Sequence, residues 1–305
     1  METLAISKFA SLHNDKTIFF SHIRHTEEAF SKIRQLDHEV ILITGNCDLC
    51  IDNFFAPPNV RYWFAQNAIL NHDRIIPIPI GLTNPYPQEI PGQVTIECGG
   101  SHEHGKVLSE IVTDLFLKDK SIPEKFIYSN FTVGTNVYYR SFIRDICLNS
   151  SFMDYVDPNQ VGFNTQSGEY GIENGVQKYI QEILNHEAVL CPIGNGIDTH
   201  RVWETLYCNR IPITINANCT KAPKINHFNV GESWYAPPQE DEYALYTKLY
   251  SHLPIVILDS YEQLYDEKYL REAIQFQKNK KCNFDLLDLE YWKFLIFGLE
   301  KTLAQ

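Results

Sequence analysis

Residues 191–214 read CPIGNGIDTHRVWETLYCNRIPIT, which gives in order a buried strand end, a glycine-containing loop, a helix and a second buried strand. Gly194 and Gly196 allow close backbone approach and positive φ angles. Asp198 or Thr199 can cap the helix that follows. Strand, loop, helix and strand in this order predict a β-α-β unit of a parallel sheet.

The start of this helix favours a bound anion. Its first amides have no acceptor inside the helix, so they attract a group such as a diphosphate. His200 and Arg201 add donors at the same end, and Glu204 follows Arg201 by three residues, so the two can face the same side. A carboxylate there can accept hydrogen bonds from two ribose hydroxyls. The alternative is a surface ion pair, which contributes little; the loop and helix start favour a nucleotide-sugar site.

The stretch does not match the dinucleotide fingerprint. The third glycine would fall at Thr199, and an acidic residue about 20 positions further on at a strand end is missing. Gly100–Lys106 has the spacing of a phosphate loop, but Val107 stands where Ser or Thr is needed. Hydride-transferring Rossmann enzymes and phosphate-loop kinases are therefore disfavoured.

Outward from this stretch, short β-rich runs alternate with helical patterns along the chain. Strands are expected at Thr17–Ser21, Val40–Thr44, Val60–Phe64, Ile75–Ile80, Lys125–Phe131, Phe152–Val156, Ala188–Cys191, Ile211–Ile215 and Ile255–Leu258. Helices are expected at Glu27–Leu36, Lys106–Lys118, Val137–Leu148, Gly171–His186, Thr199–Cys208 and over most of Asp266–Ala304. Pro77 and Pro79 predict that their strand is an edge or irregular one, and Asn84–Gly105 is expected to be a loop.

This alternation predicts an α/β fold with two similar halves. We expect an N-terminal Rossmann-like domain over 1–122 and a second one over 123–265, with a helical segment over 266–305 that packs back on the first domain. In such an arrangement the natural ligand site is a cleft.

Composition excludes several classes of protein. The chain has 305 residues and a net charge of −12, which disfavours general binding to nucleic acid or to anionic membranes. No apolar run approaches the ~20 residues that span a bilayer. Eight cysteines are too few for a disulfide scaffold, so we expect reduced thiols.

Three segments together resemble the exostosin-like glycosyltransferases, which are glycosyltransferase family 47 and its bacterial or viral relatives. The most specific is the glycine loop and helix of residues 194–204, followed by Ile-Pro-Ile. The second is Ile43–Asp48 with Trp63–Asn67 and Ile78–Leu82, and the third is Tyr128–Thr132 with Thr135, Asn136 and Arg140. The resemblance extends from about residue 17 to residue 260.

The resemblance implies a GT-B fold, in which two Rossmann-like domains face each other and the last helix crosses back to the first. It implies an inverting, metal-independent enzyme whose C-terminal domain holds a nucleoside-diphosphate sugar, a UDP-sugar being favoured. Arg201 would contact the diphosphate and Glu204 the ribose. The candidate donor-binding residues are Asn130, Asn136, Arg140, Gly194, Asn195, Gly196, Asp198, Thr199, His200, Arg201 and Glu204.

The reaction needs a base for the acceptor hydroxyl. Asp48 follows a buried strand, Asp73 lies between two strand-like runs, and His25 follows the first strand. Each is also a reasonable loop group or helix cap. Asp48 and Asp73 rank equally and His25 ranks third.

We therefore expect a cytoplasmic glycosyltransferase of a bacterium or a virus-infected host, with a glycan acceptor, no metal and no nucleic-acid partner. No Asp-x-Asp stands at a strand end to hold Mg²⁺ or Mn²⁺ on a diphosphate. The alternative is an inactive nucleotide- or glycan-binding protein on the same scaffold. The sequence leaves open the sugar, the base, the linkage and the oligomeric state.

Overall fold

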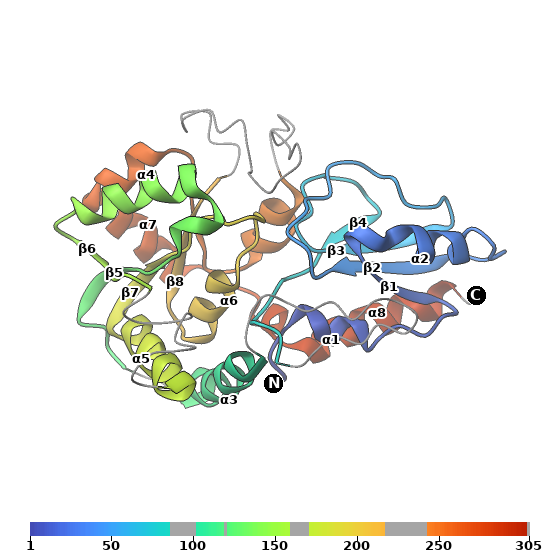
Figure 1. The fold of residues 1–305 in the computed structure, drawn as a ribbon, viewed down its shortest axis with the longest axis horizontal. Coiled ribbons are helices and arrows are strands. Elements are labelled where there is room, and N and C mark those ends of the chain that lie inside the picture. The colour runs from blue at the N-terminus through green and yellow to red at the C-terminus, as the bar shows by residue number, and fades with distance from the viewer. Residues whose placement is uncertain (86–101, 119–120, 159–170, 217–242, 304–305) are drawn as a thin grey trace. The chain divides into compact units, whose positions relative to one another are not determined.

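The computed structural model describes residues 1–85, 102–118, 121–158, 171–216 and 243–303. The chain divides into two compact units (Figure 1). The first unit comprises residues 1–106, 242–252 and 283–305, and the second comprises residues 107–241 and 253–282. Each unit is built around one parallel sheet, so the predicted α/β class is confirmed.

The sheet of the first unit has four strands in the order β1-β2-β3-β4, and all neighbouring pairs are parallel. The strands are β1 (Ile18–His22), β2 (Val40–Gly45), β3 (Val60–Ala65) and β4 (Ile75–Pro77). The short β4 carries Pro77 at the edge of the sheet, as its prolines predict. Every residue of β1 and β2 is buried, which explains their continuous apolar runs.

Helices cover this sheet on both faces. Phe30 and Ile33 of α2 (Thr26–Ile33) pack in one cluster with Trp63 of the sheet. Figure 1 shows α1 (Ile6–Ala10) and α8 (Leu289–Leu303) on the other face. There the rings of Phe9 and Trp292 meet edge to face at 6.2 Å. The end of the chain is thus part of the first unit's core.

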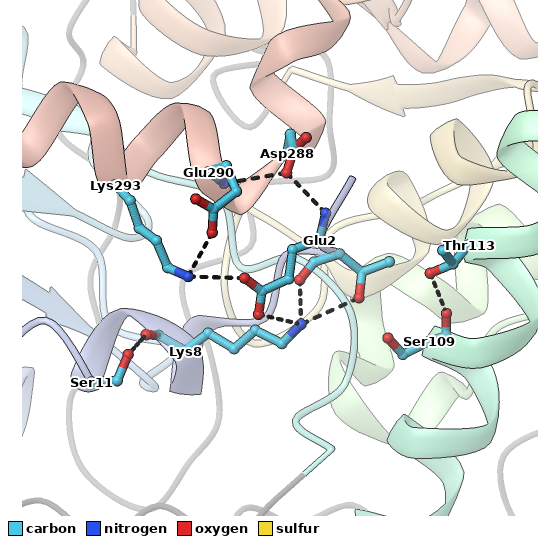
Figure 2. Close-up of polar contacts among 9 residues, drawn as sticks. Glu2, Lys8, Ser11, Ser109, Thr113, Asp288, Glu290 and Lys293 are labelled. Atoms are coloured by element: carbon cyan, nitrogen blue, oxygen red, sulfur yellow. Dashed lines mark hydrogen bonds and ion pairs between the residues drawn. The ribbon is translucent and has the colours of Figure 1, made fainter.

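Charged groups fix the N-terminal segment to α8 (Figure 2). Lys293 Nζ lies 2.9 Å from Glu2 Oε2 and 2.7 Å from Glu290 Oε1. Asp288 Oδ1 accepts from the backbone N–H of Glu2 at 2.9 Å and from that of Glu290 at 3.2 Å. Residues that are 286 positions apart are held together in this way.

The helix α3 (His102–Lys118) begins earlier than the sequence predicts. The expected loop over Asn84–Gly105 is therefore wrong at its C-terminal end, and residues 86–101 lie outside the described chain. A Cβ at Gly105 would lie 2.5 Å from the carbonyl oxygen of Thr83. Gly105 is thus a close-packing glycine inside a helix rather than a turn residue.

The sheet of the second unit has five parallel strands in the order β6-β5-β7-β8-β9. The strands are β5 (Lys125–Ser129), β6 (Met153–Tyr155), β7 (His186–Leu190), β8 (Ile211–Ile215) and β9 (Val256–Leu258). Numbered within the unit this order is 2-1-3-4-5, which is a doubly wound arrangement.

In Figure 1, α4 (Val137–Leu148) and α7 (Glu267–Asn279) lie on one face of this sheet, and α5 (Gly171–Asn185) and α6 (His200–Tyr207) lie on the other. Residues of α4 and α7 share a core cluster with alternate residues of the strands. α7 thus belongs to the second unit, whereas α8 belongs to the first. The shorter elements are η1 (Ile23–His25), η2 (Val133–Thr135), η3 (Leu245–Leu249), η4 (Tyr250–His252), η5 (Tyr261–Tyr265) and η6 (Phe284–Leu287).

The cysteines of the described residues (Cys47, Cys50, Cys147, Cys191, Cys208 and Cys282) are free thiols. None of the helices in the described ranges combines the length and the apolarity that a bilayer crossing demands.

Candidate functional site

The strand order of the second unit defines one place for a ligand. The chain leaves β5 toward β6 on one side, and it later leaves β7 toward β8 on the other side. The loops after β5 and β7 therefore separate at the carboxyl ends of these two strands. In doubly wound sheets this switch point is where ligands bind. Most of the candidate donor-binding residues lie on these two loops and on α6.

The loop after β7 is held by its own backbone and by the start of α6. The Gly194 N–H donates to the Gly196 carbonyl at 3.1 Å. Thr199 is the N-cap residue of α6, but its side chain makes no capping bond. Asp198 Oδ1 instead accepts from the Trp203 indole N–H at 2.8 Å. Asp198 is therefore buried as a hydrogen-bond partner of the helix, and within the described residues the expected cap by the Thr199 side chain is not formed.

The loop after β5 supports the glycine loop. Asn136 Nδ2 donates to the Gly194 carbonyl at 3.1 Å. Arg140 donates to the carbonyl oxygens of Ile193 and Pro192 at 3.0 Å and to that of Thr132 at 2.9 Å. One guanidinium thus joins the two loops through three backbone oxygens.

Arg140 packs against the backbone of Gly194 and leaves little room for a side chain at this position. A Cβ at Gly194 would lie 3.0 Å from the Arg140 Nη2 atom, and Gly194 does not have a positive φ. The glycine is needed for close approach, whereas the expected positive φ is absent. The neighbouring Asn195 is half-buried and His200 lies in the first turn of α6.

Arg201 carries the positive charge of the site. Its Nη1 donates to Asn130 Oδ1 at 3.2 Å, and its guanidinium carbon lies 5.0 Å from the centre of the Tyr179 ring. Burial acts to lower the pKa of Arg201, but Tyr179 and Glu204 outweigh it and raise that pKa. Burial, and then the charge of Arg201, lower the pKa of Arg140 to about 10. Two cations therefore lie near each other, which favours an anion beside them.

Glu204 is fully buried, and its two carboxylate oxygens differ. Oε2 accepts a 2.6 Å hydrogen bond from the Tyr179 hydroxyl. Among the described residues, Oε1 has no hydrogen-bond partner, and neither do Thr199 Oγ1 or the Tyr128 hydroxyl oxygen. Buried polar atoms without partners are uncommon in folded proteins and are costly. These three atoms come from β5 (Tyr128), from the N-cap of α6 (Thr199) and from the middle of α6 (Glu204).

Two tyrosines of this site were not assigned a role from the sequence. Burial, as the largest cause, raises the pKa of Tyr179 well above its ordinary value and also raises that of Tyr128, so both hydroxyls stay protonated. Tyr179 comes from α5, where it follows the same apolar spacing as Val176 and Ile183. Nothing in that spacing separates it from an ordinary core residue.

Cys191, at the head of the glycine loop, is not a nucleophile at neutral pH. Its side chain is completely buried, and burial raises the pKa of the thiol to about 12. The two arginines and the start of α6 can attract an anion, and the Glu204 carboxylate can accept hydrogen bonds from hydroxyls.

The base candidates lie in the first unit, and the structure separates them. Asp48 is exposed in the loop after β2, and His25 is exposed in η1 after β1, so both lie beyond the carboxyl ends of the strands. Asp73 is also exposed, but it precedes β4 and lies at the amino ends. Since ligands of parallel sheets bind beyond the carboxyl ends, Asp48 and His25 have the favoured position.

Side-chain amides build the surroundings of Asp48. Asn46 has a left-handed φ of 57°, and its N–H donates to Gln66 Oε1 at 2.8 Å. Asn67 Nδ2 donates to the Cys47 carbonyl at 3.0 Å, and Asn84 Nδ2 donates to Asn46 Oδ1 at 3.1 Å. These bonds fix the backbone on the N-terminal side of Asp48.

No protein-family model matches this chain, and a search of curated proteins finds no match either.

Proposed function

We propose that the second unit binds a nucleoside-diphosphate sugar at the carboxyl ends of β5 and β7. The observation that carries this proposal is the pair Arg201 and Glu204, three residues apart on α6 and next to the switch point. A cation at a helix start suits a diphosphate, and a carboxylate one turn further on suits a ribose diol. One helix can then recognise both ends of a nucleoside diphosphate.

The unpaired oxygen of Glu204 supports the ribose assignment. Glu204 Oε1 is buried and has no partner in the part of the chain that the structure describes, and two ribose hydroxyls can supply the missing donors. A ligand reaches this atom only after a neighbouring side chain moves, and such rotamer changes are common on binding. Thr199 Oγ1, which is also unpartnered, can donate to a phosphate oxygen.

We further propose that the chain is an inverting glycosyltransferase with the two-domain GT-B arrangement, as its resemblance to the exostosin-like enzymes implies. The acceptor hydroxyl attacks the anomeric carbon of the UDP-sugar, the bond to the diphosphate breaks, and a base takes the hydroxyl proton. Asp48 or His25 is the base, because both lie beyond the carboxyl ends of the first unit's strands. Asp73 ranks after them.

In this proposal the protein's own cations stabilise the leaving diphosphate. Arg201 and the first-turn amides of α6 supply the charge that a metal ion supplies in other enzymes. Turnover should therefore continue in excess EDTA.

The experiment that tests the activity is a UDP-release assay with several UDP-sugars and short glycans, with and without EDTA. UDP release that requires a glycan and survives EDTA supports the proposal. If activity is lost in EDTA and restored by Mn²⁺, the metal-independent mechanism is wrong. If UDP binds and no UDP-sugar turns over, the protein is an inactive binding protein on this scaffold.

A further inference from the structure

The first unit contains a cavity of about 460 Å³ that the proposed function does not use. Its lining comes from β4 and the residue Asp73 before it, from η3 and η4, and from η6 and α8 with the residue Asn283 before η6. Asp73 lines it, together with Lys248, His252, Asn283, Tyr291 and Trp292. Ligand pockets range from about 300 to 1,000 Å³, so the cavity can hold a small organic molecule.

Two residues of the lining, Lys248 and Trp292, are held by hydrogen bonds to backbone carbonyl oxygens. Lys248 Nζ donates to the carbonyl oxygens of His72 at 2.9 Å and of Ile75 at 3.4 Å. The Trp292 indole N–H donates to the Leu286 carbonyl at 3.1 Å. The Lys248 ammonium is therefore partly occupied by backbone oxygens, and the buried Trp292 supports the lining from behind without offering its N–H group to a ligand.

Three other groups remain available to a ligand. Within the described residues, no hydrogen bond or ion pair engages the side chains of Asp73, His252 or Tyr291. Asp73 is an acceptor, His252 has a donor and an acceptor nitrogen, and the Tyr291 hydroxyl can do both. The ring of Tyr291 packs edge to face on Trp292, with the centres 5.6 Å apart at 86°. Aromatic rings thus lie beside unused donors and acceptors.

We propose that this cavity is a saccharide-binding site. A sugar ring has an apolar face that packs on aromatic rings and hydroxyls that both donate and accept. The lining offers both kinds of surface, through the ring of the half-buried Tyr291 and through the polar groups of Asp73 and His252. A phosphate is a poorer ligand for this lining, because the Asp73 carboxylate would repel it. Lys248 cannot fully compensate, since its ammonium already donates to backbone carbonyl oxygens. An apolar ligand would leave these polar groups unpaired, which is costly.

The site gives the first unit a role in holding a neutral glycan, separate from the nucleotide site of the second unit. We infer it from the first unit alone, so it does not depend on the proposed glycosyl transfer. Its ligand is a mono-, di- or trisaccharide segment, because the cavity is near the small end of the usual range.

The test is saturation-transfer NMR and isothermal titration of the full chain with xylotriose, cellotriose, maltotriose and mannotriose, and with glucuronate and inorganic phosphate as anions. We expect one of the neutral trisaccharides to bind. His252→Ala and Tyr291→Ala should each weaken that binding about tenfold, which is the loss expected for one hydrogen bond or aromatic contact. Because Tyr291 packs on Trp292, the exposed His252 provides the variant that is safe for folding.

Phe294→Ala is the matched control, because Phe294 lies on the same helix and is 80% exposed outside the cavity lining. It should leave saccharide binding unchanged, and all three variants should bind UDP like the original chain. The proposal is overturned if none of the four trisaccharides binds, if binding survives both cavity substitutions, or if an anion binds more tightly than the neutral sugars. UDP binding in the same samples reports on the second unit separately.

Discussion

The Tyr179 hydroxyl donates a 2.6 Å hydrogen bond to Glu204 Oε2, and it leaves Glu204 Oε1 as the unpartnered oxygen. The ring of the same tyrosine lies 5.0 Å from the guanidinium carbon of Arg201. One buried side chain of α5 thus contacts both residues of α6 that we assign to the nucleotide. Tyr179 fixes which carboxylate oxygen is free for a ligand, and it supports the cation at the same time.

Tyr179→Phe should weaken UDP binding about tenfold or more while pyrophosphate binding changes little. The ring and its contact with Arg201 remain, but Glu204 loses its donor and becomes less well oriented. A hydrogen bond to a charged group contributes about 1.5–3 kcal/mol, so the melting temperature should also fall. Titration with UDP and with pyrophosphate measures the two effects.

Tyr128→Phe is the control for this substitution. The Tyr128 hydroxyl is buried and finds no partner in the described ranges, so its removal should leave the fold as stable or slightly more stable. Equal losses of stability and of UDP affinity in both variants would show that Tyr179 acts only as a core residue.

Arg140→Ala should release the glycine loop. The carbonyl oxygens of Thr132, Pro192 and Ile193 lose their common donor, and for the buried Pro192 and Ile193 an unpaired carbonyl costs roughly 1–3 kcal/mol each. Hydrogen exchange of the loop should increase and UDP affinity should fall. Arg140→Lys should rescue little, because an ammonium cannot reproduce the forked geometry. A lysine variant that behaves like the original chain would contradict this role.

The proposed base can be found by three matched substitutions in a turnover assay. Asp48→Asn or His25→Gln should reduce the maximal rate by about 10²- to 10⁴-fold, with normal binding of the UDP-sugar. Asp73→Asn should leave the maximal rate close to that of the original chain, since Asp73 precedes β4 and lies at the amino ends of the strands. If all three leave the maximal rate within a few-fold, the base does not belong to these loops.

Asp154 should make stability depend on acidic pH. Burial acts to raise its pKa, but Lys125 and His186 outweigh it and lower the pKa below the ordinary value of 3.8. A carboxylate with a lowered pKa stabilises the fold above its unfolded-state pKa and loses this contribution as the pH falls through its folded-state pKa.

Asp154→Asn should therefore lower the urea midpoint at neutral pH, and the two midpoints should converge as the pH falls below 3.8. The effect is small, because Asp154 and Lys125 are both about half-exposed and solvent screens such pairs. A difference that stays constant over this pH range would contradict the assignment.

The sequence predicts the strands and most helices because their patterns are local. The bounds of β8 and α4 agree with the predicted ones, and the other strand bounds differ by a few residues. The start of α3 was missed because Gly105 resembles a loop glycine, whereas a backbone contact with Thr83 requires it within a helix. Such a contact between distant segments leaves no local pattern.

In the candidate site, too, the residues with a local sequence pattern are predictable, and the residues that act through contacts between distant segments are not. Arg201 and Glu204 are recognisable because both lie on one helix next to a glycine loop. The contacts of Tyr179 with these residues cannot be recognised from the sequence, because α5 meets α6 only through tertiary packing. Arg140 was expected near the donor, but its three bonds to loop carbonyls depend on how β5 and β7 are paired.

The most direct test of the nucleotide site is isothermal titration of the original chain and of Glu204→Gln with UDP and with pyrophosphate. The glutamine keeps the volume and an acceptor for Tyr179 but removes the charge. We predict that the original chain binds UDP more tightly than pyrophosphate, and that Glu204→Gln weakens UDP binding about tenfold to a hundredfold while pyrophosphate binding is unchanged. An unchanged dissociation constant for UDP in the variant, or an original chain that does not bind UDP, would contradict the assignment of Glu204 to the ribose.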